Sequence, residues 1–448
     1  MSEPIISVSG LRGIVGQQLT PAVVMRYVSA FCTTLPRGNF VVGRDGRTSG
    51  SMYAKVAAST LMGHGMVVVD ADVVATPSLG VLVREIGAVG GLQISASHNP
   101  PAYNGLKLFN HEGRVIPAEA GNKVLIAYKQ SLSKWTEIDG IGTFSLAADP
   151  HEPHLAAVIK TIDIARIRTR GFKVLLDSNH GAGALLGRRL LEELGCRITI
   201  LGEEPSGLFA HPPEPTADNL QSVTSTVLDG GFDIGFCQDP DADRLAVIDE
   251  RGVYIGEEFT AVLCMMHRLE TNPGPVVTNC ASSSMTEQIA KRLRVQFTRS
   301  PVGEANVVDA MKRTQSVYGG EGSGGPIDPR VGYVRDSFVG MAQILDLMAN
   351  RGKKLSVIVG ELPSLVMIKD KLTIAPENIP TSFTKIERAL MAPAVDRQDG
   401  LRLDWPDQWI ILRASNTEPL VRLIAEASTQ NEAVALIEAA KKAIGIRE

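Results

Sequence analysis

Residues 66–97, MVVVDADVVATPSLGVLVREIGAVGGLQISAS, decide the fold because two short apolar segments flank a helical pattern there. The segments MVVVDADV (66–73) and GLQISAS (91–97) have the length and composition of buried strands, and a helix is predicted from Pro77. FVVGRD (40–45) is a third strand candidate, and another helical pattern follows it. Strands that alternate with helices in this way predict an α/β fold with parallel strands.

This rhythm of strands and helices returns twice further along the chain. After a break at DPHEPH (149–154), a second cycle holds KVLLDSN (173–179), RITILGE (197–203) and DIGFCQD (233–239), and a third holds PVVTNC (275–280) and VQFTRS (295–300). The tail is richer in strand candidates, namely LRLDW (401–405), QWIILRAS (408–415) and LVRLIAEA (420–427). We therefore predict three similar mixed-sheet α/β domains at 1–150, 151–254 and 255–365, followed by a smaller α+β domain at 366–448.

The composition argues against several classes of protein. The 448 residues carry a formal net charge of −4 with no long run of one sign, so neither nucleic-acid nor membrane-surface binding is indicated. No apolar run has the length of a membrane span, and the start MSEPIISVSGLRG does not resemble a secretion signal. The five cysteines are scattered without a CxxC pair, which predicts reduced thiols in a cytoplasmic protein; the sequence gives no sign of an oligomeric state.

The loop SASHNPPAYNGLK (95–107) follows a buried strand, where parallel-sheet proteins place their ligand sites. It carries Ser97, His98 and Lys107. A serine hydroxyl with a base and a cation nearby can act as a nucleophile toward phosphate. Taken alone, however, the loop favours a polar turn in which Ser97 and Asn99 bond only to the backbone.

The segment DPDADR (239–244) places carboxylates at alternate positions, on Asp239, Asp241 and Asp243. Carboxylates this close repel one another unless a cation lies among them, and hard cations prefer oxygen ligands. An EF-hand is disfavoured, because Arg244 stands where the loop needs glycine and the flanking segments resemble strands. Metal binding is favoured over a solvated acidic turn because apolar strands on both sides hold the acids in place.

Three glycine-containing or arginine-containing segments remain. RASNTEPLVR (413–422) offers hydroxyls, backbone amides and two arginines to a phosphate dianion, with an ordinary solvated hairpin as the alternative. YGGEGSGG (318–325) offers Glu321 and Ser323 to sugar hydroxyls, or is simply flexible. The glycines after KVLLDSN suggest a dinucleotide site, but their GxGxxxG spacing departs from GxGxxG, so helix packing on the sheet is favoured.

In this order, SASHNP, DPDADR, GGEGSGG and RASNTEP resemble the four signature loops of the α-D-phosphohexomutase family. SGLRG (9–13), GRDGRTSG (43–50), YNGLK (103–107) and HPPEPTADNL (211–220) also match, so the resemblance covers nearly the whole chain. It implies four domains around a central cleft. It also implies a mutase that moves phosphate between the 6- and 1-positions of a hexose through a phosphoserine, with Mg²⁺ as cofactor and a hexose 1,6-bisphosphate as intermediate and activator.

The resemblance assigns a role to each matching position. Ser97 would be the phosphoserine, and Mg²⁺ would be bound by Asp239, Asp241, Asp243 and an oxygen of Ser97. The further catalytic residues would be Arg12, His98, Lys107 and Arg244. Sugar hydroxyls would meet Glu321 and Ser323, and the existing phosphate of the sugar phosphate substrate would meet Arg413, Ser415, Asn416, Thr417 and Arg422.

Two positions depart from the family pattern. Many members have a histidine where this chain has Gly325, which leaves the proton-transfer group open among His98, Lys107 and Glu321. Asn416 stands where many members have glycine, and a left-handed turn tolerates it. GGEGSGG resembles the loop of archaeal-type phosphoglucosamine mutases, which predicts glucosamine 6-phosphate as substrate. Phosphomannomutase or phosphoglucomutase activity is the alternative, and a sugar phosphatase or a non-catalytic sugar-phosphate sensor is a remoter one.

Overall fold

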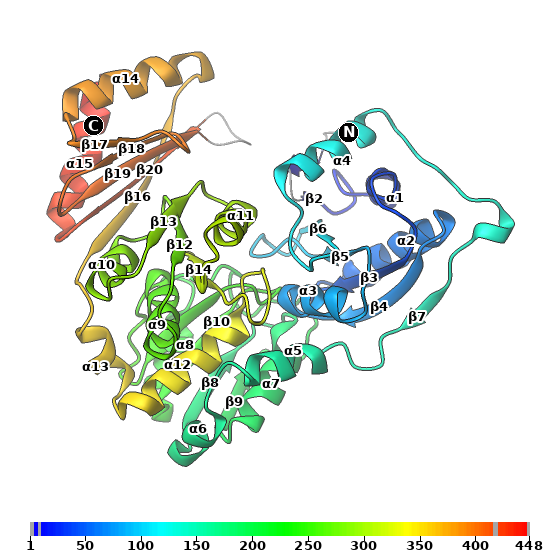
Figure 1. The fold of residues 1–448 in the computed structure, drawn as a ribbon, viewed down its shortest axis with the longest axis horizontal. Helices are drawn as coiled ribbons and strands as arrows, with labels where there is room; N and C mark the ends of the chain where they lie inside the picture. Colours follow the sequence, from blue (N-terminus) through cyan, green and yellow to red (C-terminus); the bar gives the residue numbers. More distant parts are fainter. Residues whose placement is uncertain (1–3, 8–9, 415–419, 446–448) are drawn as a thin grey trace.

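The computed structural model describes residues 4–7, 10–414 and 420–445, which form four β-sheets with helices around them (Figure 1). The N-terminal sheet has seven strands, in the order β1 (Ile5–Ser7), β2 (Gly10–Ile14), β6 (Tyr103–Asn110), β5 (Gly90–Ile94), β3 (Asn39–Arg44), β4 (Val67–Val73) and β7 (Phe144–Leu146). Its helices are α1 (Pro21–Cys32), α2 (Gly50–Gly63), α3 (Thr76–Glu85) and α4 (Ala118–Lys129), and η1 (Ile138–Gly140) is a short 3₁₀ turn before β7.

The second and third sheets have four strands each. The second has the order β11 (Leu245–Asp249), β10 (Ile234–Gln238), β8 (Lys173–Asp177) and β9 (Arg197–Leu201), with α5 (Glu152–Ile159), α6 (Ile164–Arg170), α7 (Gly183–Glu193) and α8 (Gln221–Gly230). The third has the order β13 (Phe297–Ser300), β12 (Val276–Asn279), β14 (Tyr318–Glu321) and β15 (Gly325–Ile327). The helices of the third unit are α9 (Glu257–Thr271), α10 (Met285–Arg292), α11 (Glu304–Thr314), α12 (Ser337–Arg351) and α13 (Leu355–Gly360).

These three sheets share one pairing pattern. In the first, β3 pairs in parallel with β4 and with β5, and β5 pairs antiparallel with β6. In the second, β8 pairs in parallel with β9 and β10, and β10 pairs antiparallel with β11. In the third, β12, β13, β14 and β15 repeat the arrangement. The prediction of three similar mixed-sheet α/β units is confirmed.

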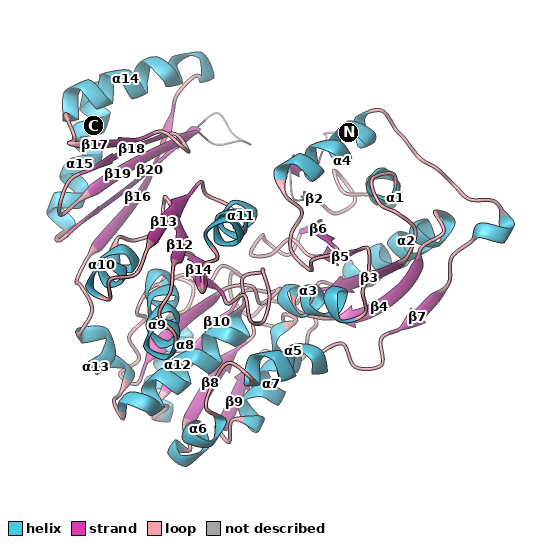
Figure 2. Ribbon diagram, viewed as in Figure 1, coloured by secondary structure: helices cyan, strands magenta, loops and turns pink. Residues whose placement is uncertain are grey.

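The C-terminal sheet is different, because all of its pairs are antiparallel. Its order is β16 (Val366–Thr373), β20 (Leu420–Ala427), β19 (Trp409–Ala414), β18 (Leu401–Asp404) and β17 (Ala394–Asp396). It is accompanied by η2 (Pro376–Asn378), α14 (Ile379–Leu390) and α15 (Gln430–Ala443); α15 packs against β16, β20 and α14 (Figure 2). The tail is therefore α+β as predicted, although β16, β17 and α14 lie outside the segments that the sequence marks.

A single apolar core joins the second and third units. It includes Phe236 of β10 and Tyr318 of β14, and helix α12, which carries Phe338, packs against α9 of the third unit and against α5, α6 and α7 of the second. The C-terminal sheet has a core of its own. It meets the third unit through a small apolar cluster that contains Cys280 and Trp409. The C-terminal unit, which starts at β16, therefore has a core separate from the rest of the chain, whereas the second and third units share one.

The five cysteines are free thiols, and all but Cys196 are buried. Burial raises the pKa of Cys32 and of Cys196 to about 12, so neither thiol forms a thiolate at neutral pH. Within the described ranges, no helix combines the length and the apolar character needed to cross a bilayer.

Candidate active site

Ser97 lies in the tight loop that joins β5 to β6. β5 is buried along its whole length, and the polar side chains of SASHNP follow at its carboxyl end. Parallel-sheet proteins place their ligand sites at this end of a strand. The backbone of Ser97 is left-handed, with φ of +50°, a conformation that costs a non-glycine residue about 1–2 kcal/mol. Its amide donates to Ser95 Oγ at 2.8 Å, and its Oγ donates to Asp239 Oδ2 at 2.8 Å. The loop thus presents a buried hydroxyl to the acidic segment of the second unit.

The side chain of Arg47, which is 2% exposed, holds the backbone of this loop. Its guanidinium donates to four carbonyl oxygens at 2.6–2.9 Å, those of Ser97, Asn99, Pro100 and Tyr103. Asp45 pairs with Arg47 at 3.2 Å and also accepts from Ser95 Oγ at 2.7 Å. Phe209 of the second unit lies over the guanidinium at 5.0 Å. Arg47 therefore fixes the backbone on which Ser97 is carried.

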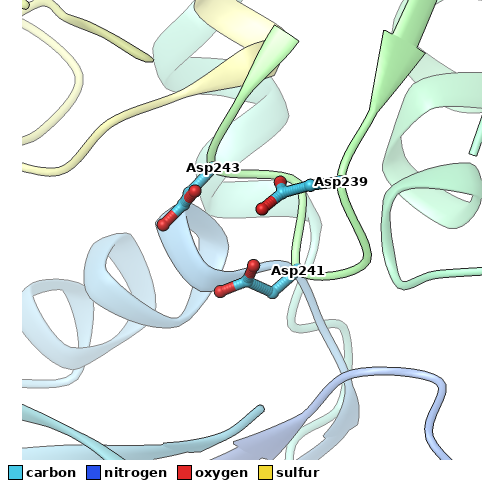
Figure 3. Close-up of side chains that lie close together, drawn as sticks. All are labelled: Asp239, Asp241 and Asp243. Carbon is cyan, nitrogen blue, oxygen red and sulfur yellow. The ribbon is translucent and has the colours of Figure 1, made fainter. Parts of the chain in front are cut away.

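Asp239, Asp241 and Asp243 lie in the turn between β10 and β11, and all three are fully buried. One oxygen of each lies within 4.8 Å of the others, and Figure 3 shows the three carboxylates gathered at one point. Thr76, at the start of α3, donates its hydroxyl to Asp241 Oδ2 and its amide to the Asp241 carbonyl, the latter at 2.9 Å. The first unit therefore helps to position the acidic turn of the second.

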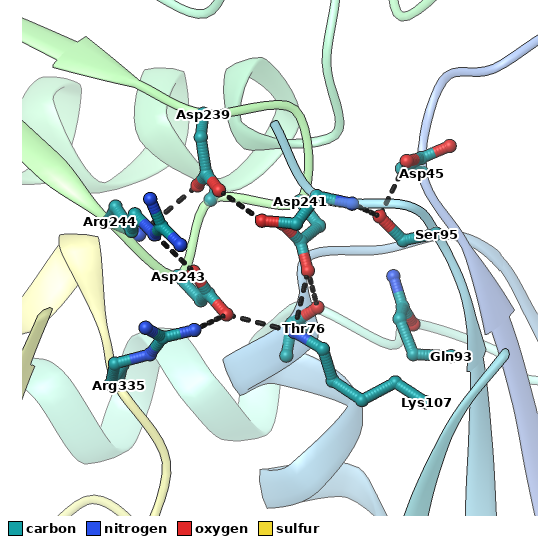
Figure 4. A network of polar contacts seen from close by, with 12 residues as sticks. Asp45, Thr76, Gln93, Ser95, Lys107, Asp239, Asp241, Asp243, Arg244 and Arg335 are labelled. Atoms are coloured by element: carbon teal, nitrogen blue, oxygen red, sulfur yellow. Dashed lines mark hydrogen bonds and ion pairs between the residues drawn. The ribbon is translucent and has the colours of Figure 1, made fainter. Parts of the chain in front are cut away.

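Two cations reach this acidic turn from other units (Figure 4). Lys107 Nζ lies 2.9 Å from Asp241 Oδ2 and 2.8 Å from Asp243 Oδ2, and Arg335 donates to Asp243 Oδ2 at 2.7 Å. Burial alone would lower the pKa of Lys107, but Asp241 and Asp243 hold it above its usual value, so the amine stays charged. Burial alone would raise the pKa of Asp243, yet Arg335 and Lys107 hold it far below its usual range.

The acidic turn has the donor set that Mg²⁺ prefers. Oδ1 of Asp241 and Oδ1 of Asp243 are buried and have no hydrogen-bond partner among the described residues. Burial, together with the charges of Asp243 and Asp241, holds the pKa of Asp239 well above its usual value. Clustered carboxylate oxygens without donors fit a hard cation, and Ser97 Oγ is close enough to add a further oxygen.

Arg12, His98 and Arg244 line the cavity beside Ser97. The Nδ1 atom of His98 lies 3.4 Å from Ser97 Oγ. Burial, and then the charges of Arg244 and Arg12, lowers the pKa of His98 to about 3, so the ring is neutral at neutral pH. Arg244 Nε lies 3.9 Å from Asp243 Oδ1. These residues surround Ser97 with positive charge and one uncharged ring nitrogen.

The loop between β14 and β15 forms another wall of the cavity, with Glu321 and Ser323 in its lining. The Glu321 carboxylate accepts three hydrogen bonds at 2.9–3.1 Å, from Asn279 Nδ2, the Gly303 amide and an Arg335 guanidinium nitrogen. The carbonyl of Gly324 accepts from the Leu245 amide at 2.9 Å. The candidate sugar loop is therefore bonded directly to the strand that follows the acidic turn.

Arg335 fills the space beside Gly325. A Cβ on Gly325 would lie 2.4 Å from Arg335 Cδ. The guanidinium bonds to Asp243, Glu321 and Glu304 at 2.7–3.0 Å. Burial alone would lower the pKa of Arg335, but these carboxylates raise it well above its usual value. The space beside Gly325, where many family members have a histidine side chain, is thus filled by the permanently charged side chain of Arg335.

Three cations lie side by side on the C-terminal sheet. Arg422 of β20 pairs with Arg413 of β19 and with Lys371 of β16, so the three side chains share one face, and all three line the cavity. Asp399 Oδ2 accepts from Arg413 Nε at 2.9 Å. Ser415, Asn416 and Thr417 lie outside the described residues, and their part in phosphate binding stays a prediction.

A cavity of about 860 Å³ joins these groups, and parts of all four units line it. Pockets of about 300–1,000 Å³ are typical of small-molecule sites. Its lining includes the sequence-marked residues Arg12, His98, Lys107, Arg244, Glu321, Ser323, Arg413 and Arg422. Ser97 and the three aspartates are buried next to His98 and Lys107. One cavity therefore brings together segments that are far apart in the chain.

The sequence does not mark four further residues of the site. Arg47 lies inside GRDGRTSG, a segment that matches the family pattern, but the sequence does not indicate what this arginine contacts. Arg335 in YVRDSFVG lies just before a helix, and Glu304 in PVGEANV is the first residue of another. Charged residues are ordinary at such positions. Lys371 lies in the part of β16 where exposed residues alternate with less exposed ones, and an exposed lysine is ordinary there too.

Known proteins resemble this chain over nearly its whole length. Models of the phosphoglucomutase/phosphomannomutase family match residues 5–134 (alpha/beta/alpha domain I), 152–252 (domain II), 256–366 (domain III) and 372–443 (C-terminal domain). A phosphoglucomutase/phosphomannomutase of Thermococcus kodakarensis is 33% identical, with 96% of each chain covered. A phosphoglucosamine/phosphogalactosamine mutase of Sulfurisphaera tokodaii is 30% identical over 97% of this chain and 98% of the relative.

A solved structure extends the likeness to three dimensions. The crystal structure of a phosphoglucomutase/phosphomannomutase family protein from Burkholderia thailandensis has a TM-score of 0.86 and 25% sequence identity, and 99% of each chain is covered. All four family domains are matched in order, and full-length relatives exceed 30% identity. The chain therefore belongs to the phosphoglucomutase/phosphomannomutase family of isomerases.

Proposed function

We propose that this chain is a phosphosugar mutase that interconverts the 6-phosphate and 1-phosphate of a hexose, with Ser97 as phosphate carrier. The observation that carries the proposal is the placement of Ser97 Oγ 2.8 Å from Asp239, beside a cavity that also contains Arg413 and Arg422. Glucosamine 6-phosphate is the proposed substrate, in line with the relative from Sulfurisphaera tokodaii. Mannose and glucose phosphates are the alternative, in line with the relative from Thermococcus kodakarensis.

Ser97 would first give its phosphate to the free hydroxyl of the bound sugar phosphate. The serine O–P bond breaks while the sugar O–P bond forms, which yields a hexose 1,6-bisphosphate. Arg12, Lys107 and Arg244 supply positive charge around the moving phosphate, and such charge is the main requirement of phosphoryl transfer. The bisphosphate then turns over in the cavity and returns its other phosphate to Ser97, so the carrier is restored.

The contacts support His98 as the group that takes the proton of the Ser97 hydroxyl when the serine recovers a phosphate from the bisphosphate. Its Nδ1 lies 3.4 Å from Ser97 Oγ and is uncharged. Lys107 is held as a cation, and Glu321 already accepts three hydrogen bonds. Burial and then the nearby arginines lower the pKa of His98, and a phosphate dianion beside Ser97 would offset the arginine charges.

Asp239, Asp241, Asp243 and an oxygen of Ser97 would hold Mg²⁺. Its chemistry would be to neutralise charge on the phosphate during transfer. The buried Oδ1 atoms of Asp241 and Asp243, which accept no hydrogen bond from any residue that the structure describes, support this assignment.

The C-terminal sheet would hold the phosphate that is not being transferred. Arg413, Arg422 and Lys371 supply the charge, and the loop with Ser415, Asn416 and Thr417 would add hydroxyls and amides. Glu321 and Ser323 would bond to sugar hydroxyls between the two phosphate sites. The five free thiols support a cytoplasmic location for this activity.

Two measurements test this function. Intact-mass spectrometry should find one phosphate on Ser97 after incubation with a hexose 1,6-bisphosphate and Mg²⁺. The primed enzyme should then interconvert glucosamine 6-phosphate and 1-phosphate faster than the corresponding mannose and glucose phosphates. Absence of both the phosphate and any interconversion would overturn the proposal. Steady release of inorganic phosphate without isomer formation would indicate a phosphatase instead.

A further inference from the structure

The third unit gives the cavity an acidic wall, and one carboxylate oxygen there has no hydrogen-bond partner within the described part of the chain. Its carboxyl groups in the lining are Glu257, Glu258, Glu304 and Glu321. Glu321 is fully bonded, and Glu258 accepts from the Ser283 amide at 2.8 Å. Glu304 differs. Its Oε2 accepts from Arg335 Nε at 3.0 Å, whereas its Oε1 is buried without any hydrogen-bond partner among the described residues.

Charge is also unbalanced around Glu304. Its side chain is only 9% exposed, so water screens it poorly. The nearest cation, Arg335, is shared among Glu304, Glu321 and Asp243. Burial raises the pKa of Glu304 to about 7 although the charges of Arg335 and Lys107 lower it, which indicates that these shared cations do not compensate the carboxylate. A ligand that brings a cationic N–H donor would correct both the missing donor and the missing charge, whereas a neutral hydroxyl would correct only the first.

We propose that Glu304 binds the C2 ammonium group of an amino-sugar phosphate and thereby selects glucosamine 6-phosphate over glucose 6-phosphate. This inference rests on the proposed mutase function, because it assigns the selectivity of the same cavity. One guanidinium spans the space between Glu304 and Asp243, so Glu304 lies at the Ser97 end of the cavity. In a hexose, C2 is bonded to C1. When the C1 hydroxyl faces Ser97, the C2 substituent therefore faces the same end.

The inference is tested by changing one atom on each side of the contact. Glucosamine 6-phosphate and glucose 6-phosphate differ only at C2, and Glu304→Gln removes the negative charge while keeping the size of the side chain. A charge-assisted hydrogen bond contributes about 1.5–3 kcal/mol, so Glu304→Gln should lower the ratio of the two kcat/KM values by about ten- to a hundredfold. The loss should fall on the amino sugar. An equal loss on both sugars, or an unchanged ratio, would overturn the assignment.

Two matched variants accompany this measurement. Glu270→Gln changes a carboxylate of the same unit that pairs with Arg351 outside the cavity, and it should leave the ratio unchanged. Glu304→Asp keeps the charge and should retain part of the preference for the amino sugar. If Glu304→Gln fails to fold, the Glu304→Asp comparison decides the matter, because a preference for the amino sugar that is unchanged in Glu304→Asp would come from elsewhere in the cavity.

A binding measurement separates this inference from the mutase proposal. In a Ser97→Ala background, calorimetry should find tighter binding of glucosamine 6-phosphate than of glucose 6-phosphate or N-acetylglucosamine 6-phosphate, which lack the charge. Adding Glu304→Gln should abolish that preference. A protein that binds selectively but isomerises no sugar phosphate would contradict the mutase function alone. A protein that isomerises glucose or mannose phosphates without any preference for the amino sugar would contradict the role of Glu304 alone.

Discussion

Replacing Arg47 by methionine should destabilise the loop that carries Ser97 without touching Ser97 itself. The guanidinium donates to four carbonyl oxygens of the loop and pairs with the fully buried Asp45. Methionine retains most of the side-chain volume but supplies none of these donors. In the variant, Asp45 loses its cation and the loop carbonyls lose their common donor.

The size of the effect follows from these contacts. Removing one partner of a buried ion pair costs about 3–5 kcal/mol. Some of the carbonyl oxygens regain water, so we take about 4 kcal/mol as the loss in local unfolding free energy. With a urea slope of about 2 kcal/mol per molar, the unfolding midpoint of the first unit should fall by about 2 M.

Hydrogen exchange read by mass spectrometry in rising urea would follow the first unit separately from the rest of the chain. Peptides from β5 and β6 should show the shift, whereas peptides from β19 and β20 serve as the internal reference. Arg26→Met is the matched control, because Arg26 is exposed and lies over the Tyr128 ring at 4.6 Å, a contact that contributes about 1 kcal/mol at most. Phosphorylation of Ser97 by a hexose bisphosphate should also slow in Arg47→Met. A midpoint within about 0.5 M of wild type, with normal phosphorylation, would refute the reasoning.

Three further outcomes are expected. Gly325→Ala should lower kcat/KM at least about tenfold with the fold retained. The new Cβ would lie 2.4 Å from Arg335 Cδ, and three carboxylates hold that guanidinium in place, so Arg335 could not move away without losing these bonds. Wild-type kinetics would contradict this expectation. Arg422→Met should raise KM for the sugar phosphate about ten- to a hundredfold, as expected from the loss of a charge-assisted hydrogen bond, whereas Arg397→Met, which removes a partner of Glu387 away from the cavity, should not. Burial raises the pKa of Glu258 from 4.5 to about 8, so folding favours its neutral form and stability should fall as the pH rises through that range. Thermal unfolding from pH 5 to 9 should therefore show a flatter profile for Glu258→Gln, and parallel profiles would count against the assigned shift.

The repeating α/β units could be predicted because their strands and helices are short, buried and regularly spaced. The segments 66–73 and 91–97 contain β4 and most of β5, and the helix predicted from Pro77 begins at Thr76. β16 could not be predicted in the same way, since VMIKDKLT mixes lysines and an aspartate with apolar residues. It becomes a strand because β20 pairs with it along its whole length. That pairing is a long-range contact, which local periodicity does not contain.

The site shows the same division between local and long-range information. Ser97 and Asp239 lie in loops that the sequence marks by their polar residues, and the structure brings the two side chains into contact. Arg335 is different, because it gains its importance only when the segment between β15 and α12 brings it within hydrogen-bond distance of Asp243 and Glu321. Gly325 signalled a missing side chain in the sequence, but only the folded chain supplies the side chain that takes its place.

The separate core of the C-terminal sheet has a consequence for how the intermediate can turn over. Between this sheet and the third unit, the described residues share one small apolar cluster and a few polar contacts, such as Glu426 with the Ser284 amide and Asp399 with the Val302 amide at 2.8 Å. The second and third units are tied together by a continuous core, which Ala75 and Val81 of the first unit also join, and they cannot part without exposing it. A bisphosphate that must exchange its two ends needs temporary room. The C-terminal sheet, which carries Arg413 and Arg422, can rotate away from the third unit at this contact while the loop that carries Ser97 stays in place. The enzyme would then weaken its contacts with the sugar phosphate without disturbing the position of the phosphate carrier.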